Sequence, residues 1–228
     1  MPLEIREALT ESDALRIATI ERDAYLPNPF NPILFPGPLP DDALQRRAAE
    51  LVRNKNANPI NTKWFTVVDT DIVPGDVPGG EGMISFAQWV IIYNNPPTKP
   101  GKEGGETKEA TTQKRETFPW ANAAACDALF GGLAKLREEI MGSRNHIYFS
   151  YLQTDPKHER RGAGGMLLKA CVEEGERLGL PVLLTSSPAG RPLYVRNGFT
   201  DVKKFELDFA QWGLDKVQEV WAMIREPQ

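Results

Sequence analysis

The sequence predicts a single α/β domain in which helices flank a mixed β-sheet. Three observations favour this fold class. The chain has 228 residues, of which 41% are hydrophobic and 25% charged, an ordinary composition for one large globular domain. Segments of strand-like composition alternate with segments of helical periodicity along the chain. Finally, the glycine-rich stretch HERRGAGGMLL at 158–168 follows a strand-like segment and opens an apolar helix.

The N-terminal part is expected to form a strand and two helices. Residues 3–9 alternate between apolar and polar side chains, as a short strand does. Thr10 or Ser12 can cap the helix that follows, which is expected to reach about Tyr25. A second helix is expected at 41–54, where two aspartates at its start would interact favourably with the positive end of the helix dipole.

The segment 26–40, LPNPFNPILFPGPLP, connects these two helices. Its prolines argue against both a helix and a central strand. It nevertheless carries the apolar side chains of Phe30, Ile33, Leu34 and Phe35. Two interpretations remain open: a lid beside a substrate, or a loop that packs on the core.

Two strands and an insertion are expected next. Residues 63–70 and 83–93 are rich in β-formers, and the Gly/Pro-rich segment between them is typical of a hairpin loop. Residues 94–118 are rich in Pro, Gly, Lys and Glu and almost lack apolar side chains. This composition predicts a mobile insertion. An additional helix is expected within 119–141, with Gly142 at its end.

The C-terminal part carries the clearest alternation of strands and helices. Expected strands lie at 146–154, 181–185, 199–209 and 217–225, and expected helices at about 162–178 and 188–196. For the short helix, Ser187 fits the N-cap, Pro188 the first helical position and Asn197-Gly198 the end.

Composition argues against several classes of protein. The net charge of −4, from 27 basic and 31 acidic residues, disfavours a general nucleic-acid binder. The two cysteines, Cys126 and Cys171, cannot build a disulfide framework or a zinc site, and core packing is expected for both. With only His146 and His158, no metal site is expected. The N-terminus lacks an apolar signal region and no run approaches the length of a membrane span, so a cytoplasmic location is expected.

The glycines at 162–165 predict an anion site. The first amides of a helix have no intrahelical partner, and the helix dipole attracts negative charge, typically phosphate. Glycine lets another molecule approach the backbone closely. A nucleotide P-loop would need Gly-Lys-Ser/Thr, but Gly164-Gly165-Met166 stands here. A dinucleotide fingerprint would need a glycine at Leu167.

Two motifs resemble those of the GNAT acyltransferase superfamily. The first is LQTDPKHERRGAGGMLL, which is similar to the Gln/Arg-x-x-Gly-x-Gly/Ala signature after a strand and a proline. The second is SSPAGRPLYVRNGF, which is similar to the Tyr-x-x-x-Gly-Phe motif of the family. The element order resembles the family over nearly the whole chain, whereas the specific motifs lie within 146–199. Glu159 departs from the pattern, because it stands where the family usually has Gln or Arg.

The resemblance implies a GNAT-type sheet that is mixed and mostly antiparallel, and acetyl-CoA as co-substrate. Backbone amides from Arg161 to Gly165 would cradle the pyrophosphate, and strand 146–154 would splay from its neighbour to bind the pantetheine arm. The amide near Leu152 would donate to the thioester oxygen. The implied cofactor-binding residues are Leu152, Gln153, Thr154, Arg160, Arg161, Gly162, Ala163, Gly164, Gly165, Ser187 and Tyr194.

The resemblance also implies direct attack of an acceptor amine on the thioester, with Tyr194 as general acid. The alternative for Tyr194 is a half-buried core tyrosine. For the general base, Glu81 and a water chain near Tyr148, Ser150 or Tyr151 stay open. The expected acceptor is a small-molecule amine that contacts Tyr25, Phe30 and Phe35, in a monomer or homodimer. A non-catalytic module that binds CoA for regulation is the alternative function.

Overall fold

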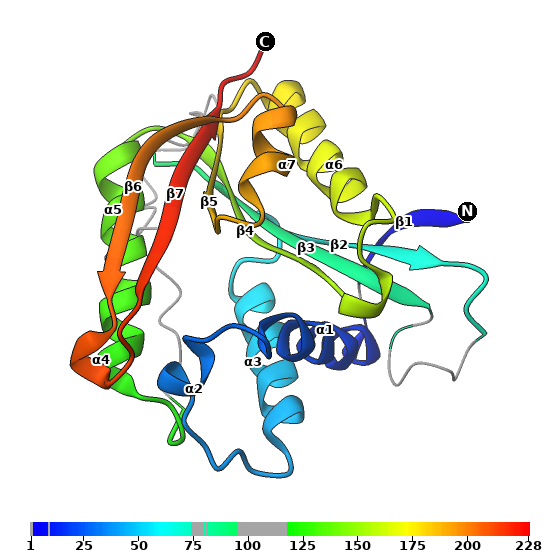
Figure 1. Ribbon diagram of the computed structural model, residues 1–228. Coiled ribbons are helices and arrows are strands. Elements are labelled where there is room, and N and C mark those ends of the chain that lie inside the picture. Colours follow the sequence, from blue (N-terminus) through cyan, green and yellow to red (C-terminus); the bar gives the residue numbers. More distant parts are fainter. Residues whose placement is uncertain (1, 9, 74–79, 81, 95–117) are drawn as a thin grey trace.

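The computed structural model describes residues 2–8, 10–73, 80, 82–94 and 118–228. These residues form a seven-stranded sheet with the order β1-β2-β3-β4-β5-β7-β6 (Figure 1). Neighbouring strands are antiparallel except for β4 and β5, which run parallel. The expected mixed, mostly antiparallel sheet is confirmed.

The strands lie close to where the sequence predicts them. They are β1 (Leu3–Glu7), β2 (Thr62–Asp69), β3 (Met83–Ile92), β4 (His146–Thr154), β5 (Val182–Ser186), β6 (Thr200–Asp208) and β7 (Val217–Arg225). The bounds of β4 and β7 match the prediction to the residue.

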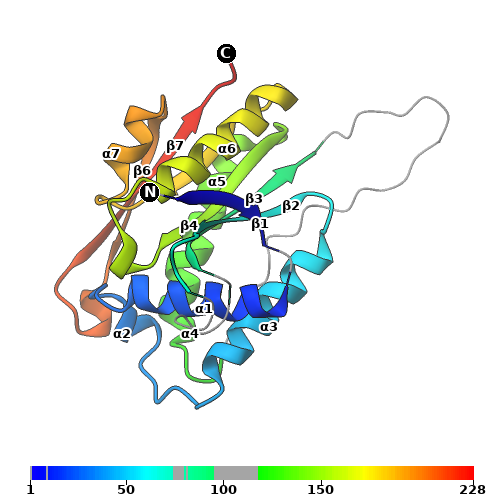
Figure 2. The same ribbon diagram turned by 90° about the vertical axis from the view of Figure 1, so that its right-hand side faces the viewer.

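Helices cover both faces of the sheet. They are α1 (Glu11–Tyr25), α2 (Asn31–Leu34), α3 (Ala43–Ala57), α4 (Ala123–Cys126), α5 (Gly132–Met141), α6 (Ala163–Leu178) and α7 (Arg191–Arg196). Figure 2 shows α1 and α3 on one face and α6 on the other. Among the described residues, no helix combines the length and the hydropathy that crossing a bilayer requires.

Each face has its own core. On the α6 face, Leu167, Leu168 and Cys171 pack against β3, β4 and β5 through side chains such as Trp89 and Phe149. On the opposite face, apolar residues of α1 and α3 pack against Trp64 and Phe86, among others. Because both faces are covered, the central strand β3 is almost entirely buried and has a largely apolar sequence.

Capping explains the predicted start of α1. The Thr10 hydroxyl accepts from the Asp13 amide at 3.0 Å, and the Asp13 carboxylate accepts from the Thr10 amide at 2.8 Å. This reciprocal capping box fixes the helix start, as the sequence indicates.

Two predictions about helices were wrong. The segment 26–40 contains the short helix α2, because Pro32 lies in the first turn, where its missing N–H is not needed. The helix predicted at 188–196 begins only at Arg191, and Ser187 instead accepts from the Gly190 amide at 3.2 Å in the preceding turn.

The additional helical region begins at Ala123 and contains a π-helical turn, Asp127–Gly131, between α4 and α5. The helix ends at Gly142, whose φ of 49° suits glycine. Of the predicted insertion, residues 95–117 lie outside the described residues, as do 74–79 and 81 of the hairpin loop.

Candidate functional site

The parallel strands β4 and β5 pair only along part of their length. Their pairs run from Ile147–Val182 to Phe149–Leu184, although β4 continues to Thr154. Each strand stays paired on its other side, β4 with β3 and β5 with β7. We call the unpaired region between residues 150–154 and 185–186 the β4–β5 opening. Each edge of the opening is held in place by the strand on its other side. The backbone N–H and C=O groups that face the opening are not used in β4–β5 pairing.

A β-bulge at Ser150 sets which amides of β4 face the opening. The register between β3 and β4 shifts at this point, so that Ser150 is the extra residue. The amide of Ile147 donates toward β5, whereas the amide of Asp155 donates to β3. Successive amides along a strand point alternately to its two sides. Because the Asp155 amide points to β3, the amides of Leu152 and Thr154 point toward the opening.

The glycine-rich loop ends beside this opening. Gly162 is the N-cap of α6, with a φ of 91° that L side chains rarely adopt, and no side chain caps the helix. The Met166 amide makes the first intrahelical bond, to the Gly162 carbonyl. The amides of Ala163, Gly164 and Gly165 therefore precede the bonded part of the helix and can accept an anion.

The two glycines in the first turn of α6 face different surroundings. A Cβ at Gly164 would lie 3.7 Å from Leu152 and 3.8 Å from Thr154, which is ordinary contact distance. A Cβ at Gly165 would meet no atom within 4 Å. Gly164 thus packs the helix start onto β4, and Gly165 is the position that is open to an approaching molecule.

The arginines of this loop differ in their contacts. Arg161 donates to Asp69 at 2.6 Å, and one of its nitrogens lies 3.1 Å from His158 Nδ1. The hydrogen bond from Arg161 lowers the pKa of Asp69. The charge of the Arg161 side chain is therefore shared with Asp69. Arg160, whose φ is 62°, and Glu159 are both exposed.

Tyr194 of α7 is almost fully buried, with 8% of its surface exposed. Its ring packs edge-on against Phe199 at 5.9 Å. Burial raises the pKa of Tyr194 well above its usual value, and the nearby Tyr25 phenol raises it further. The hydroxyl therefore keeps its proton at neutral pH, as a general acid requires.

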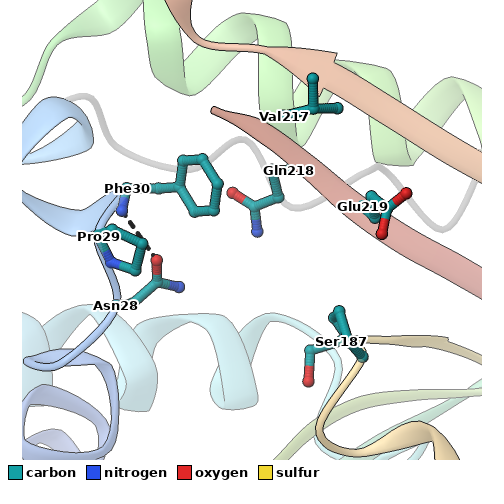
Figure 3. A pocket seen from close by; sticks show the side chains of 8 residues that line it. Asn28, Pro29, Phe30, Ser187, Val217, Gln218 and Glu219 are labelled. Carbon is teal, nitrogen blue, oxygen red and sulfur yellow. Dashed lines mark hydrogen bonds between the residues drawn. The ribbon is translucent and has the colours of Figure 1, made fainter. Parts of the chain in front are cut away.

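A pocket of about 230 Å³ lies where three separate segments meet (Figure 3). It is lined by Asn28, Pro29, Phe30, Ser187, Pro188, Val217, Gln218 and Glu219. The Phe30 ring and the Gln218 amide lie next to one another in Figure 3, and Ser187 comes from the end of β5. The side-chain oxygen of Gln218, Oε1, is buried without a hydrogen-bond partner.

The structure brings only part of the predicted acceptor residues to this pocket. Phe30 lines it, and its ring lies 4.7 Å from that of Phe209. Phe35 packs against the apolar cluster that includes Phe209, Ala125 and Leu129. Tyr25 is 45% exposed at the end of α1. Glu81, a considered general base, lies outside the described residues.

The opening, the helix N-terminus and the two motifs agree with comparisons to known proteins. Residues 106–213 match the family model described as an acetyltransferase (GNAT) domain. This match, which covers a little under half of the chain, and the shared fold support the GNAT superfamily. They also support an acyl-CoA-dependent acetyltransferase activity in general terms.

Solved GNAT structures match along the whole chain. One is a histone acetyltransferase HPA2 and related acetyltransferase from Corynebacterium glutamicum, with 16% identity, a TM-score of 0.57 and coverage of 100% of this chain and 98% of that one. Arabidopsis thaliana NAA60 in complex with acetyl-CoA shares 15% identity, with a TM-score of 0.52 and coverage of 99% and 98%. The PaiA N-acetyltransferase of Thermoplasma acidophilum, in complex with coenzyme A, shares 13%, with a TM-score of 0.50 and coverage of 99% of both chains. At these identities the likeness shows the shared fold.

Several polar contacts of this domain have no signal in the sequence. Arg47 of α3 donates to Glu21 of α1, to Glu50 and, at 3.3 Å, to the Tyr151 hydroxyl. Gln88 joins Trp64 to Ser150 across three strands. These residues are far apart in sequence and meet only when α1 and α3 cover the sheet. No group of three or more His, Cys, Asp or Glu in the described part of the chain is arranged to hold a metal ion.

Proposed function

We propose that the protein transfers an acetyl group from acetyl-CoA to the amino group of a small amine, by direct attack in a ternary complex. The observation that carries this proposal is the β4–β5 opening, which ends beside the uncapped N-terminus of α6. An extended thiol arm can bind to a free strand edge, and a pyrophosphate to the helix amides.

The residues present fit acetyl-CoA. The amides of Ala163, Gly164 and Gly165 can receive the pyrophosphate, and the exposed Arg160 adds positive charge. The amides of Leu152 and Thr154 on the opening can bind the pantetheine arm and the thioester. In this proposal Gln153, Arg161, Gly162 and Ser187 shape the same site. Glu159 lies on the exposed surface, where water can screen its charge.

The chemistry needs a donor for the oxyanion and a proton for the thiolate. When the amine nitrogen attacks the thioester carbon, negative charge grows on the carbonyl oxygen, which the Leu152 amide stabilises. As the tetrahedral intermediate collapses, the C–S bond breaks and the sulfur takes a proton from Tyr194. The amine has lost one proton, which restores the tyrosine, so the products are the acetylated amine and free CoA.

The pocket beside Phe30 supports a small acceptor. Its volume of about 230 Å³ is below the range of roughly 300–1,000 Å³ that drug-sized ligands occupy. The Phe30 ring and the polar groups of Asn28, Gln218 and Glu219 line the same pocket, which suits an amine with an apolar part. A long peptide would need a more extended groove.

Two measurements on the full chain test the proposal. Acetyl-CoA should raise the melting temperature, and free thiol should appear with one or more of phenethylamine, putrescine and lysine amide. A short alanyl peptide is the comparison acceptor. Thiol release with the peptide alone would contradict the small-amine acceptor. A thermal shift with no thiol release on any acceptor would favour the alternative, a non-catalytic CoA-binding module.

A further inference from the structure

A chain of hydrogen bonds runs through three strands to the bulge of β4. The Trp64 indole N–H donates to Gln88 Oε1 at 2.7 Å, and Gln88 Nε2 donates to Ser150 Oγ at 2.9 Å. The Ser150 hydroxyl in turn donates to the Gln88 backbone carbonyl at 3.2 Å. Trp64 and Gln88 are each only 2% exposed, so water does not compete for these bonds.

The indole decides which way the Gln88 amide points. An indole N–H can only donate, so it must meet the oxygen of the Gln88 amide and not the nitrogen. The NH₂ group of Gln88 then faces Ser150 and can only donate to it. The orientation of the Ser150 hydroxyl is therefore set from Trp64, two strands away.

Counting protons and lone pairs shows what Ser150 has left to offer. A serine hydroxyl has one proton and two lone pairs. Its proton is donated to the Gln88 carbonyl, and one lone pair accepts from Gln88 Nε2. One lone pair remains, so this hydroxyl can accept a further hydrogen bond but cannot donate one.

The position of Ser150 in the sheet indicates what this lone pair can bind. Ser150 is the bulged residue directly after Phe149, the last residue of β4 that pairs with β5. It stands at the apex of the β4–β5 opening and is partly exposed, unlike Gln88. Its bond to the Gln88 side chain places it on the sheet face that α1 and α3 cover, opposite to α6.

We infer that Ser150 binds an N–H of the acceptor amine, and that Gln88 and Trp64 position it for this role. This inference rests on the proposed function. A neutral amine that donates its N–H to Ser150 keeps its own lone pair free for the thioester carbon. In this position Ser150 holds the nucleophile on the side opposite to the helix that binds the pyrophosphate.

The test compares three variants on whichever amine of the panel the parent acetylates fastest. Ser150→Ala removes the accepting oxygen and should raise the KM for the amine roughly threefold to tenfold, as expected for one lost hydrogen bond. Gln88→Leu keeps Ser150 and the backbone carbonyl to which it donates, but removes the N–H that orients its lone pairs, and should raise the same KM. Thr66→Val is the matched control, because its buried hydroxyl also bonds to a β3 carbonyl but lies on β2. None of the three should change the KM for acetyl-CoA.

Each outcome decides the matter. An unchanged amine KM in Ser150→Ala overturns the inference, as does an equal rise in both KM values, which would indicate a distorted opening. If Gln88→Leu fails to fold, Ser150→Ala alone decides. The inference is also overturned if the parent protein shows neither turnover nor a thermal shift with any amine. If acetyl-CoA still raises the melting temperature in that case, the failure lies in amine binding and not in cofactor binding.

Discussion

Arg16 of α1 and Asp155, the residue after β4, form a buried ion pair with 2.6 Å between Nη2 and Oδ2. Only 3% and 8% of the two side chains are exposed. Arg16 also donates to the Met83 carbonyl, and Asp155 accepts from the Lys157 amide. The pair thus ties α1 to the start of the loop that leads into α6.

Removing one partner of this pair should destabilise the fold strongly. In Asp155→Asn, the Arg16 guanidinium stays buried without its counterion, and we expect the free energy of unfolding to fall by about 3 kcal/mol. Urea unfolding measures this change. Asp201→Asn is the matched control, because its partner Arg191 is about two-fifths exposed, and such a pair contributes at most about 1 kcal/mol. Equal losses in the two variants would contradict the buried role of Asp155.

Acid should weaken the fold through Asp69 and Asp155. Hydrogen bonding to Arg161 lowers the pKa of Asp69; for Asp155, burial acts to raise the pKa, but bonds from Lys157 and Arg16 outweigh it. Because both folded-state pKa values lie below the unfolded value of about 3.9, their stabilisation is complete well above that pH. It is lost as the pH falls through the folded values. Between pH 6 and pH 2, the free energy of unfolding should therefore fall more steeply in the parent than in Asp69→Asn.

Gly165 is the position at which a side chain should block CoA. Acetyl-CoA at a hundredfold its dissociation constant should stabilise the parent by about 2.7 kcal/mol. Gly165→Val places its side chain in open space, so the free protein should keep its stability but lose this increment. Gly164→Ala should keep it, since its Cβ meets Leu152 at ordinary contact distance. Thermal shift assays distinguish the two, and an unchanged shift in Gly165→Val would place the pyrophosphate elsewhere.

Tyr194→Phe should lower kcat with little effect on stability. The variant keeps the ring and its packing on Phe199 but removes the acidic proton, and loss of a general acid costs about 10²–10⁴ in rate. Because the pKa of Tyr194 is raised, its protonated form persists through neutral and mildly alkaline pH. Ionisation of Tyr194 should therefore not lower the kcat of the parent below about pH 10. Turnover at the parent rate in the variant would make Tyr194 a structural residue.

Local signals explain which parts of this fold the sequence predicts. The cap at Thr10, the stop at Gly142 and the glycines before α6 act within a few residues, so they can be read directly. α2 was missed because four residues are too few for periodicity, and the prolines around it suggested a loop. The π-helical turn at 127–131 has no sequence signature comparable to a cap.

Contacts of long sequence separation explain what the sequence could not predict. Arg47 meets Tyr151 across 104 positions, and Gln88 meets Ser150 across 62. Neither pair has a motif, because each depends on the sheet register and on how helices dock. The glycine loop and Tyr194 were identified through motifs, whereas Asn28, Gln218 and Glu219 came only from the pocket.

Phe30 and Phe35 provide the sharpest test of where the acceptor binds. Both belong to the same proline-rich segment and pack on the same apolar cluster, but only Phe30 is among the residues that line the pocket. Phe30 is also held in place, since its amide donates to Asn28 Oδ1 at 2.9 Å. A ring fixed in this way can serve as a preformed wall for the apolar part of an amine.

Phe30→Ala should therefore raise the KM for the amine about tenfold, which corresponds to about 1.4 kcal/mol, and leave the KM for acetyl-CoA nearly unchanged. Each of Phe30→Ala and Phe35→Ala should lose about 1–2 kcal/mol of stability, because both rings are partly buried. Steady-state kinetics well below the melting temperatures of both variants separate binding from folding. A rise in amine KM in both variants would extend the acceptor wall to Phe35, and a rise in neither would reduce the segment to a packing role.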